Sequence, residues 1–167
     1  MNGFRHMADG SSVCLLEHVQ DTLLNAPGTE VLVGTDSHNR SDRTIYTTTV
    51  VLRYKSNGAH VIYKKERRTR ITDLFTRLWG EVERSIEVAR CLEQGQVKVH
   101  RIDLDLNSDP RYGSHVLYNA AVGYVRSFGY EARTKPDLLV ASWAANVLCN
   151  GYGRMHETPT GLSPRQG

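Results

Sequence analysis

Acidic residues recur in this chain at the ends of apolar segments, where a carboxylate needs a specific reason to stand. The clearest case is Asp36, which follows the apolar run Val31 to Val33 after the short link Gly34-Thr35. Burying an ionised carboxylate costs free energy unless it is paired, hydrogen-bonded or bound to a metal. Asp36 is therefore a candidate metal ligand at the mouth of a central strand.

Two further carboxylates share one face of a later strand. Asp103 and Asp105 stand two residues apart, so their side chains point to the same side. Asp105 lies nearer the carboxyl end of that strand, where ligands gather in open α/β sheets. Asp105 is therefore the better partner for Asp36.

Helices offer the remaining carboxylates. Glu81 lies about 60° from Leu78 around a long helix and borders its apolar stripe, whereas Glu83 and Glu87 point towards solvent. Asp137 stands where a last apolar helix begins and suits an N-cap. Glu81 and Asp137 are the helix-borne candidates.

Carboxylates collected in this way suit a hard divalent cation. Mg²⁺ and Mn²⁺ take carboxylate oxygens, and two such ions about 4 Å apart activate a water and stabilise the leaving oxygen of a phosphodiester. Three of these acids also have an ordinary structural explanation: Asp137 is a helix cap, Glu81 is a surface residue, or Asp105 is a residue that favours the turn after its strand. The predicted catalytic and metal-binding residues are Asp36, Glu81, Asp105 and Asp137.

Other chemistries have less support in the sequence. The histidines show no HxxxH or HxH spacing, so they predict no zinc site. No phosphate-binding glycine loop occurs, and neither Ser37 nor Ser142 has the GxSxG setting of a nucleophile. His38 either approaches a substrate phosphate or is an exposed loop residue. The histidines are His6, His18, His38, His60, His100, His115 and His156.

One short segment concentrates positive charge. Such a cluster can bind a phosphate backbone, and the alternative is a solvated corner between a strand and a helix. Trp143 could stack on a base or belong to the core. The predicted nucleic-acid-binding residues are Lys64, Lys65, Arg67, Arg68 and Arg70.

Hydrophobic periodicity and turn residues predict the elements that must position these side chains. Ser11 or Ser12 caps the first helix, and Ser56-Asn57-Gly58 predicts a tight hairpin turn. Helices are expected over 13–24, 71–93, 114–128 and 138–149. Strands are expected over 31–37, 44–54, 60–67, 96–106 and 130–134.

Without the leading helix, the order of elements is βββαβαβα. Strands joined by hairpins run antiparallel, and strands reached through a helix run parallel to a neighbour. This is the order of the ribonuclease H fold. We therefore expect an α/β protein with a mixed five-stranded sheet flanked by helices, with an extra N-terminal helix. A single domain over 1–150 is expected, with a flexible tail over 151–167.

Composition sets the class of protein. The chain has 167 residues, of which 40% are hydrophobic and 23% charged, with a net charge of +3. These values exclude a mostly disordered chain and a collagen-like one. There is no apolar run long enough for a membrane span or a signal peptide, and the three cysteines form no CxxC pair. We expect a reduced, cytoplasmic protein.

Several short motifs together resemble the YkuK-like family of ribonuclease H-like nucleases, over roughly 31–150. The resemblance implies a ribonuclease H-like fold and a metal-dependent nuclease, with the four acids above matching acids of the family pattern. That pattern has a further acid about nine residues after Lys-Pro-Asp, where this chain has Asn146, a weaker magnesium ligand. The motifs are Gly34-Thr35-Asp36-Ser37, Glu81 to Glu87, Val99-His100 with Asp105-Leu106-Asn107, Val122 to Val125, and Lys135-Pro136-Asp137.

Two functions from different classes follow. The first is a hydrolase, a Mg²⁺- or Mn²⁺-dependent nuclease acting on RNA, DNA or a hybrid, with Asp137 or Asn146 completing a two-ion site. The alternative is a catalytically weak or inactive ribonuclease H-fold module that binds nucleic acid or serves assembly. A phosphotransferase of the actin and sugar-kinase type shares this fold but would need a second domain.

Overall fold

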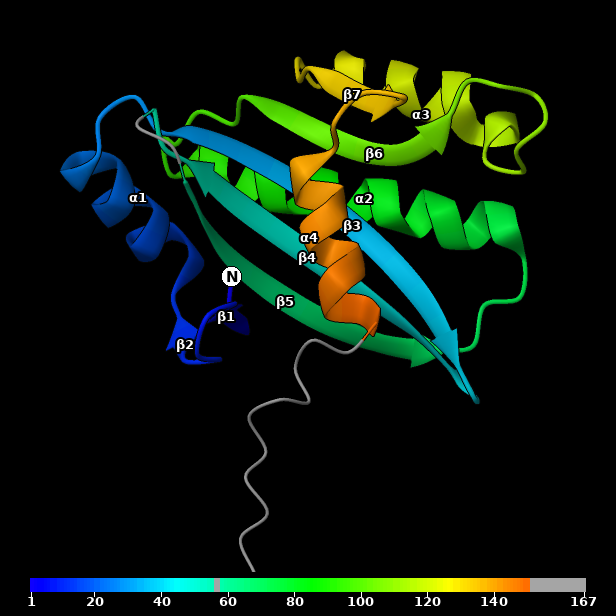
Figure 1. The fold of residues 1–167 in the computed structure, drawn as a ribbon, viewed down its shortest axis with the longest axis horizontal. Coiled ribbons are helices and arrows are strands. Elements are labelled where there is room, and N and C mark those ends of the chain that lie inside the picture. The colour runs from blue at the N-terminus through cyan, green and yellow to red at the C-terminus, as the bar shows by residue number, and fades with distance from the viewer. Residues whose placement is uncertain (56–57, 151–167) are drawn as a thin grey trace, which may run out of the picture.

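A mixed seven-stranded sheet forms the centre of the computed structural model, which describes residues 1–55 and 58–150 (Figure 1). The strands are β1 (Phe4–His6), β2 (Ser12–Val13), β3 (Glu30–Arg40), β4 (Arg43–Arg53), β5 (Ala59–Thr69), β6 (Arg101–Asn107) and β7 (Ala132–Lys135). Their order across the sheet is β2-β1-β5-β4-β3-β6-β7.

Helices cover both faces of this sheet. They are α1 (Leu15–Asn25), α2 (Leu74–Gln94), α3 (His115–Ser127) and α4 (Val140–Asn150). In Figure 1, α4 crosses in front of β3 and β4, and α2 runs behind the sheet. The buried core places α1 and α3 with α2, so within the described residues α4 is the only helix on its face.

The long strands β3, β4 and β5 form an antiparallel meander, and β6 and β7 add to it in parallel. This arrangement follows from the connections, because hairpins join the first three strands and helices lead into the last two. The chain is thus an α/β protein with a mixed sheet and the predicted βββαβαβα order from β3 to α4.

Alternation along β3 decides which side chains meet which helix. Val31 and Val33 belong to the large core beneath α2, whereas Leu32 packs with Ala141 and Ala144 of α4 in a smaller cluster. A strand buried on both faces reads as a continuous apolar run, which is why Val31 to Val33 has no polar member.

The expected number of strands was wrong. The sheet has seven strands rather than five, because β1 and β2 extend it beyond β5. These strands have only three and two residues, too few to show the alternation by which a strand is recognised in sequence.

Three element ends also differ from the predictions. Ser12 lies in β2, and α1 instead has Cys14 at its N-cap without a side-chain cap. The strand expected from residue 96 begins at Arg101. Asp137 does not cap α4, which begins at Val140; the carboxylate of Asp103 accepts a hydrogen bond from the Ala141 amide of its first turn, at 2.8 Å. A cap supplied by a neighbouring strand leaves no local sequence signal.

Two expectations fall outside the described residues: the central pair of the predicted hairpin turn, Ser56-Asn57, and the tail over 151–167. Across the described part of the chain, no helix combines the length and the apolar character needed to cross a membrane.

Candidate metal and nucleic-acid site

Asp36 and Asp105 lie on the same face of the sheet, the face that α4 crosses. On β3, Leu32 and Gly34 contact α4, so the alternating position Asp36 points the same way. On β6, Asp103 bonds to α4, so Asp105 shares that face as well. The two carboxylates predicted to act together therefore face the same side.

The neighbouring strands β3 and β6 separate just before these acids. Their registered pairs run from Leu32 with Arg101 to Gly34 with Asp103, and Asp36 and Asp105 lie beyond the last pair. A small cavity of about 10 Å³ lies there, lined by residues of β3, α2 and β6 that include Thr35, Glu81 and Asp105. Glu81, from the opposite face, therefore lines one cavity with Asp105.

Glu81 is buried, with 5% of its surface exposed, as its position beside the apolar stripe of α2 predicts. Its Oε1 accepts a hydrogen bond from Ser37 Oγ at 2.5 Å, and Ser37 Oγ accepts one from Arg77 Nη1 at 2.7 Å. Arg77 Nη1 lies 3.8 Å from the same carboxylate oxygen. Serine and arginine thus fix the orientation of the glutamate.

The electrostatics tie the three acids together. Burial, then the neighbouring charge of Asp105, raises the pKa of Asp36 to about 6. Burial, together with the charges of Asp36 and Asp105, raises the pKa of Glu81 to about 8, against the lowering effect of the Ser37 hydrogen bond and of Arg77. The charges of the three carboxylates therefore act on one another, and we refer to them as the interacting cluster.

Asp105 also lines a second, larger cavity beside α4. This groove of about 390 Å³ is lined by Asp105, Lys135, Asp137, Trp143 and Asn146, with Pro136, Leu138, Leu139 and Ser142 completing it. Asp137 is exposed at its rim, and the Trp143 ring is 65% exposed. The structure thus brings Asp137 and Asn146 into one groove with Asp105, and Glu81 does not line that groove.

A cation already neighbours Asp105. Lys135 Nζ lies 2.5 Å from Asp105 Oδ1, which is buried and has no hydrogen bond of regular geometry. Lys135 is half exposed, so its ammonium can move into the groove. An incompletely satisfied buried carboxylate oxygen is an atom that a bound cation would satisfy.

The spacing of the acids limits what the present conformation can hold. Among residues 1–55 and 58–150, no three of these carboxylates bring one oxygen each within 4.8 Å of one another. Even so, the donor set fits Mg²⁺ or Mn²⁺: it consists of carboxylates, it is partly buried, and it includes the buried Asp105 Oδ1, which has an ion pair with Lys135 but no hydrogen bond of regular geometry. Metal binding would require the carboxylates to close together and Lys135 to withdraw.

The predicted basic run is divided between the two faces of β5. Lys65 and Arg67 pair with Thr47 and Ile45 of β4 and share the face of Asp36, whereas Lys64 and Arg68 point to the face of α2. Arg70 follows β5 and bonds to the Ser41 carbonyl.

Two of these cations also have protein partners. Lys64 Nζ lies 3.1 Å from Glu66, and Lys65 Nζ donates a hydrogen bond to the Leu148 carbonyl at 2.7 Å. Arg67 and Arg68 border a surface hollow of about 410 Å³ together with Asp42 and Arg43. The run is therefore not a single basic patch.

Sequence reasoning missed the residues that hold the acids in place. Arg77 precedes Glu81 by four positions, the spacing that puts two helical side chains together, and this was a usable signal. The sequence presents Ser37 as a serine without the setting of a nucleophile and as part of a motif, and Lys135 only as part of a motif. Their partners come from other elements, which local sequence does not reveal.

Comparison with known proteins is consistent with this architecture. A family model described as Ribonuclease H-like matches residues 15–149, from the start of α1 to the end of α4. The chain therefore belongs to the ribonuclease H-like family. Neither curated proteins nor solved structures gave a match.

Proposed function

We propose that this chain is a metal-dependent nuclease that hydrolyses phosphodiester bonds in nucleic acid. The observation that carries the proposal is the interacting cluster of Asp36, Glu81 and Asp105, which come from two strands and a helix of a ribonuclease H-like fold. Burial and the neighbouring acids oppose the ionised forms of Asp36 and Glu81, and a bound cation would stabilise those forms.

Asp36, Glu81 and Asp105 would hold Mg²⁺ or Mn²⁺, with Asp137 or Asn146 adding a ligand from the groove. When bound, such ions activate a water and stabilise the leaving oxygen of the phosphodiester. Within the protein, Ser37 and Arg77 orient the Glu81 carboxylate and favour its ionised form.

The groove beside α4 offers a place for the substrate. Lys135 can exchange Asp105 for a phosphate oxygen, and the exposed Trp143 ring can stack on a base. Arg67 lies on the same face of the sheet and extends the positive charge away from the groove. A strand of nucleic acid would then cross the open part of this face.

The test is cleavage of labelled RNA, DNA and hybrid duplexes with Mg²⁺, Mn²⁺ or EDTA. We expect cleavage of at least one substrate by the unchanged protein, and loss of about 100-fold or more for Asp36→Asn, because one ligand and its charge are removed. Asp21→Asn, an exposed residue of α1, is the matched control and should cleave normally. Cleavage that persists in EDTA and in Asp36→Asn would refute the proposal.

The alternative function, a nucleic-acid-binding or assembly module without turnover, has an observation of its own. Asn146 lines the groove where the family pattern has an acid, and Lys135 neutralises Asp105. In the same experiment, tight binding of a substrate with no cleavage under any cation would favour this alternative.

A further inference from the structure

Three histidines from separate segments meet at the edge of the sheet near the N-terminus. His6 ends β1, His18 lies in α1 and His60 lies in β5. Their ring centroids are 4.7, 4.8 and 4.9 Å apart. One ligand nitrogen of each ring lies within 4.8 Å of the other two, and in the described part of the chain no other three His, Cys, Asp or Glu residues are so close.

The fold explains why these rings meet. β1 pairs with β5 so that His6 stands opposite Ile62, and His60 is two residues from Ile62 on the same face. α1 packs over that face through Leu15 and Val19, which belong to the core beneath α2. The sequence spacing gave no sign of a metal site because each ring comes from a different element.

The distances suit a tetrahedral ion. Zinc binds imidazole nitrogen at 2.0–2.1 Å, which places two ligand nitrogens of a tetrahedral site about 3.3 Å apart. The nitrogens of the cluster are near that spacing: Nε2 of His18 and Nε2 of His60 are 2.9 Å apart, and one ligand nitrogen of each ring lies within 4.8 Å of the other two. Small ring rotations are enough to bring the three nitrogens to one ion, with water as the fourth ligand.

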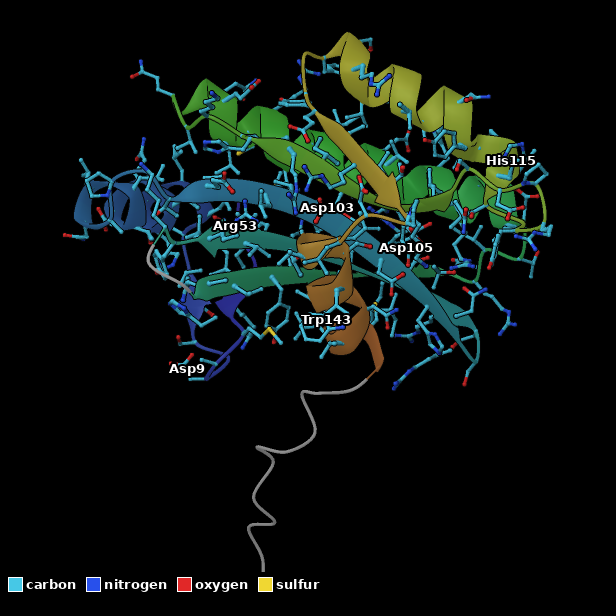
Figure 2. All side chains as sticks on the ribbon, turned by 45° about the horizontal axis from the view of Figure 1, so that its top comes forward. Asp9, Arg53, Asp103, Asp105, His115 and Trp143 are labelled. Atoms are coloured by element: carbon cyan, nitrogen blue, oxygen red, sulfur yellow. The ribbon has the colours of Figure 1, made fainter. Side chains whose placement is uncertain are left out.

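Nearby carboxylates also favour a cation at the histidine cluster. The carboxylates of Asp21 and Asp9 act on His18 and His60 respectively, and Asp9 is labelled in Figure 2.

We propose that His6, His18 and His60 bind one zinc ion, which fastens β1 and α1 to β5. The cluster lies on the face of the sheet that packs against α2, opposite to the face of Asp36 and Asp105. The zinc site is therefore independent of the proposed nuclease activity, and the chain would carry two different kinds of metal site.

The test uses the full, untagged chain, stripped with EDTA and dialysed. It is titrated with Zn²⁺ by calorimetry, in excess Mg²⁺ to occupy the carboxylate site, and with Co²⁺ by visible absorption. We expect one zinc per chain and the spectrum of tetrahedral Co²⁺. His6→Asn and His18→Asn should each weaken binding by more than about 100-fold, because even partners outside the ligand set contribute 10- to 100-fold. His115→Asn, at the start of α3, is the matched control and should bind normally.

Thermal unfolding supplies a second measurement. Zinc should raise the melting temperature of the unchanged protein and of His115→Asn, but not of His6→Asn, because only a bound ligand stabilises by mass action. If His18→Asn does not fold, His6→Asn in the short strand β1 decides the question. The absence of stoichiometric zinc binding by the unchanged protein would overturn the proposal and leave a hydrogen-bonded histidine cluster. Unweakened binding by a folded His6→Asn would also overturn it.

Discussion

Single residues of the acidic cluster differ in how strongly the fold opposes their charge. Glu81 is nearly enclosed, and its pKa of about 8 means that the metal-free protein carries it largely protonated at neutral pH. Asp36 lies at the strand end with a pKa of about 6. Without metal, carboxyl groups of the proposed site therefore carry protons, and a cation that binds would displace those protons.

The first prediction concerns stability in EDTA. Unfolded Glu81 ionises near 4.5, whereas folded Glu81 keeps its proton up to about 8, so the free energy of unfolding should fall as pH rises between these values. Glu81→Gln should remove much of this fall and be more stable at pH 8 by a few kcal/mol, since one pKa unit is worth about 1.4 kcal/mol. Urea unfolding from pH 5 to 9 measures it. Glu87→Gln, exposed on the same helix, should keep the pH dependence of the free energy of unfolding that the unchanged protein has. The same pH dependence in Glu81→Gln would refute the raised pKa of Glu81.

The second prediction concerns metal affinity. Because cations bind ionised carboxylates, Mn²⁺ binding should tighten as pH rises from about 6 to about 8, where Asp36 and Glu81 lose their protons. Calorimetric titration at several pH values measures this dependence. An affinity that does not change over this range would show that these acids do not bind the ion.

At the scale of elements, the position of α4 depends on close contact with β3. A Cβ on Gly34 would lie 2.7 Å from the Ser142 amide nitrogen and 2.9 Å from the Ala141 carbonyl carbon. Asp103, fully buried beside Arg101, accepts the Ala141 amide from the neighbouring strand. Together these contacts set α4, and with it the groove, beside the acids.

The third prediction tests that contact. Gly34→Ala should reduce the free energy of unfolding by about 1–3 kcal/mol, because the helix backbone must move away. Gly123→Ala, in α3 with no atom near the added Cβ, should instead stabilise by about 0.5–1 kcal/mol through helix propensity. Urea unfolding compares the two; a Gly34→Ala protein as stable as Gly123→Ala would contradict the account.

Helices and strands with strong hydrophobic periodicity could be predicted from the sequence. Features that depend on tertiary contacts between distant segments could not. The meander and the helices from α2 onward follow from apolar repeats and turn residues, and Glu81 was chosen among three glutamates by its helical angle. By contrast, β1 and β2 are too short to show a pattern, and the histidine cluster joins three segments that only folding brings together. The contacts of Ser37 with Glu81 and of Lys135 with Asp105 could not be predicted without the tertiary structure.

For the whole molecule, the sheet separates two surfaces with different chemistry. One face carries α4, the groove, Asp36 and Asp105, and the other carries α2 with Glu81 and the histidine cluster. The basic run is split between them by the alternation of β5. Nucleic acid bound at Asp36 and Asp105 should therefore contact only the basic residues on the same face of β5, Lys65 and Arg67.

The fourth prediction follows from this division. Arg67→Ala should weaken nucleic-acid binding and lower the slope of log affinity against log salt concentration by about 0.7–0.9, the value for one lost phosphate contact. Lys64→Ala removes one positive charge from the opposite face, outside the hollow that Arg67 borders, and should have a smaller effect. Fluorescence anisotropy at several salt concentrations compares the two variants. Equal losses of affinity would contradict the prediction that nucleic acid binds along the face of Asp36 and Arg67.

The central claim is that Asp36, Glu81 and Asp105 hold the divalent ions of a nuclease. It is tested most directly by counting Mn²⁺ bound per chain by electron paramagnetic resonance, for the unchanged protein, Asp105→Asn and the control Asp21→Asn. We expect bound Mn²⁺ in the unchanged protein and in the control. Asp105→Asn should lose both Mn²⁺ binding and cleavage activity. Equal Mn²⁺ binding by all three proteins would contradict it.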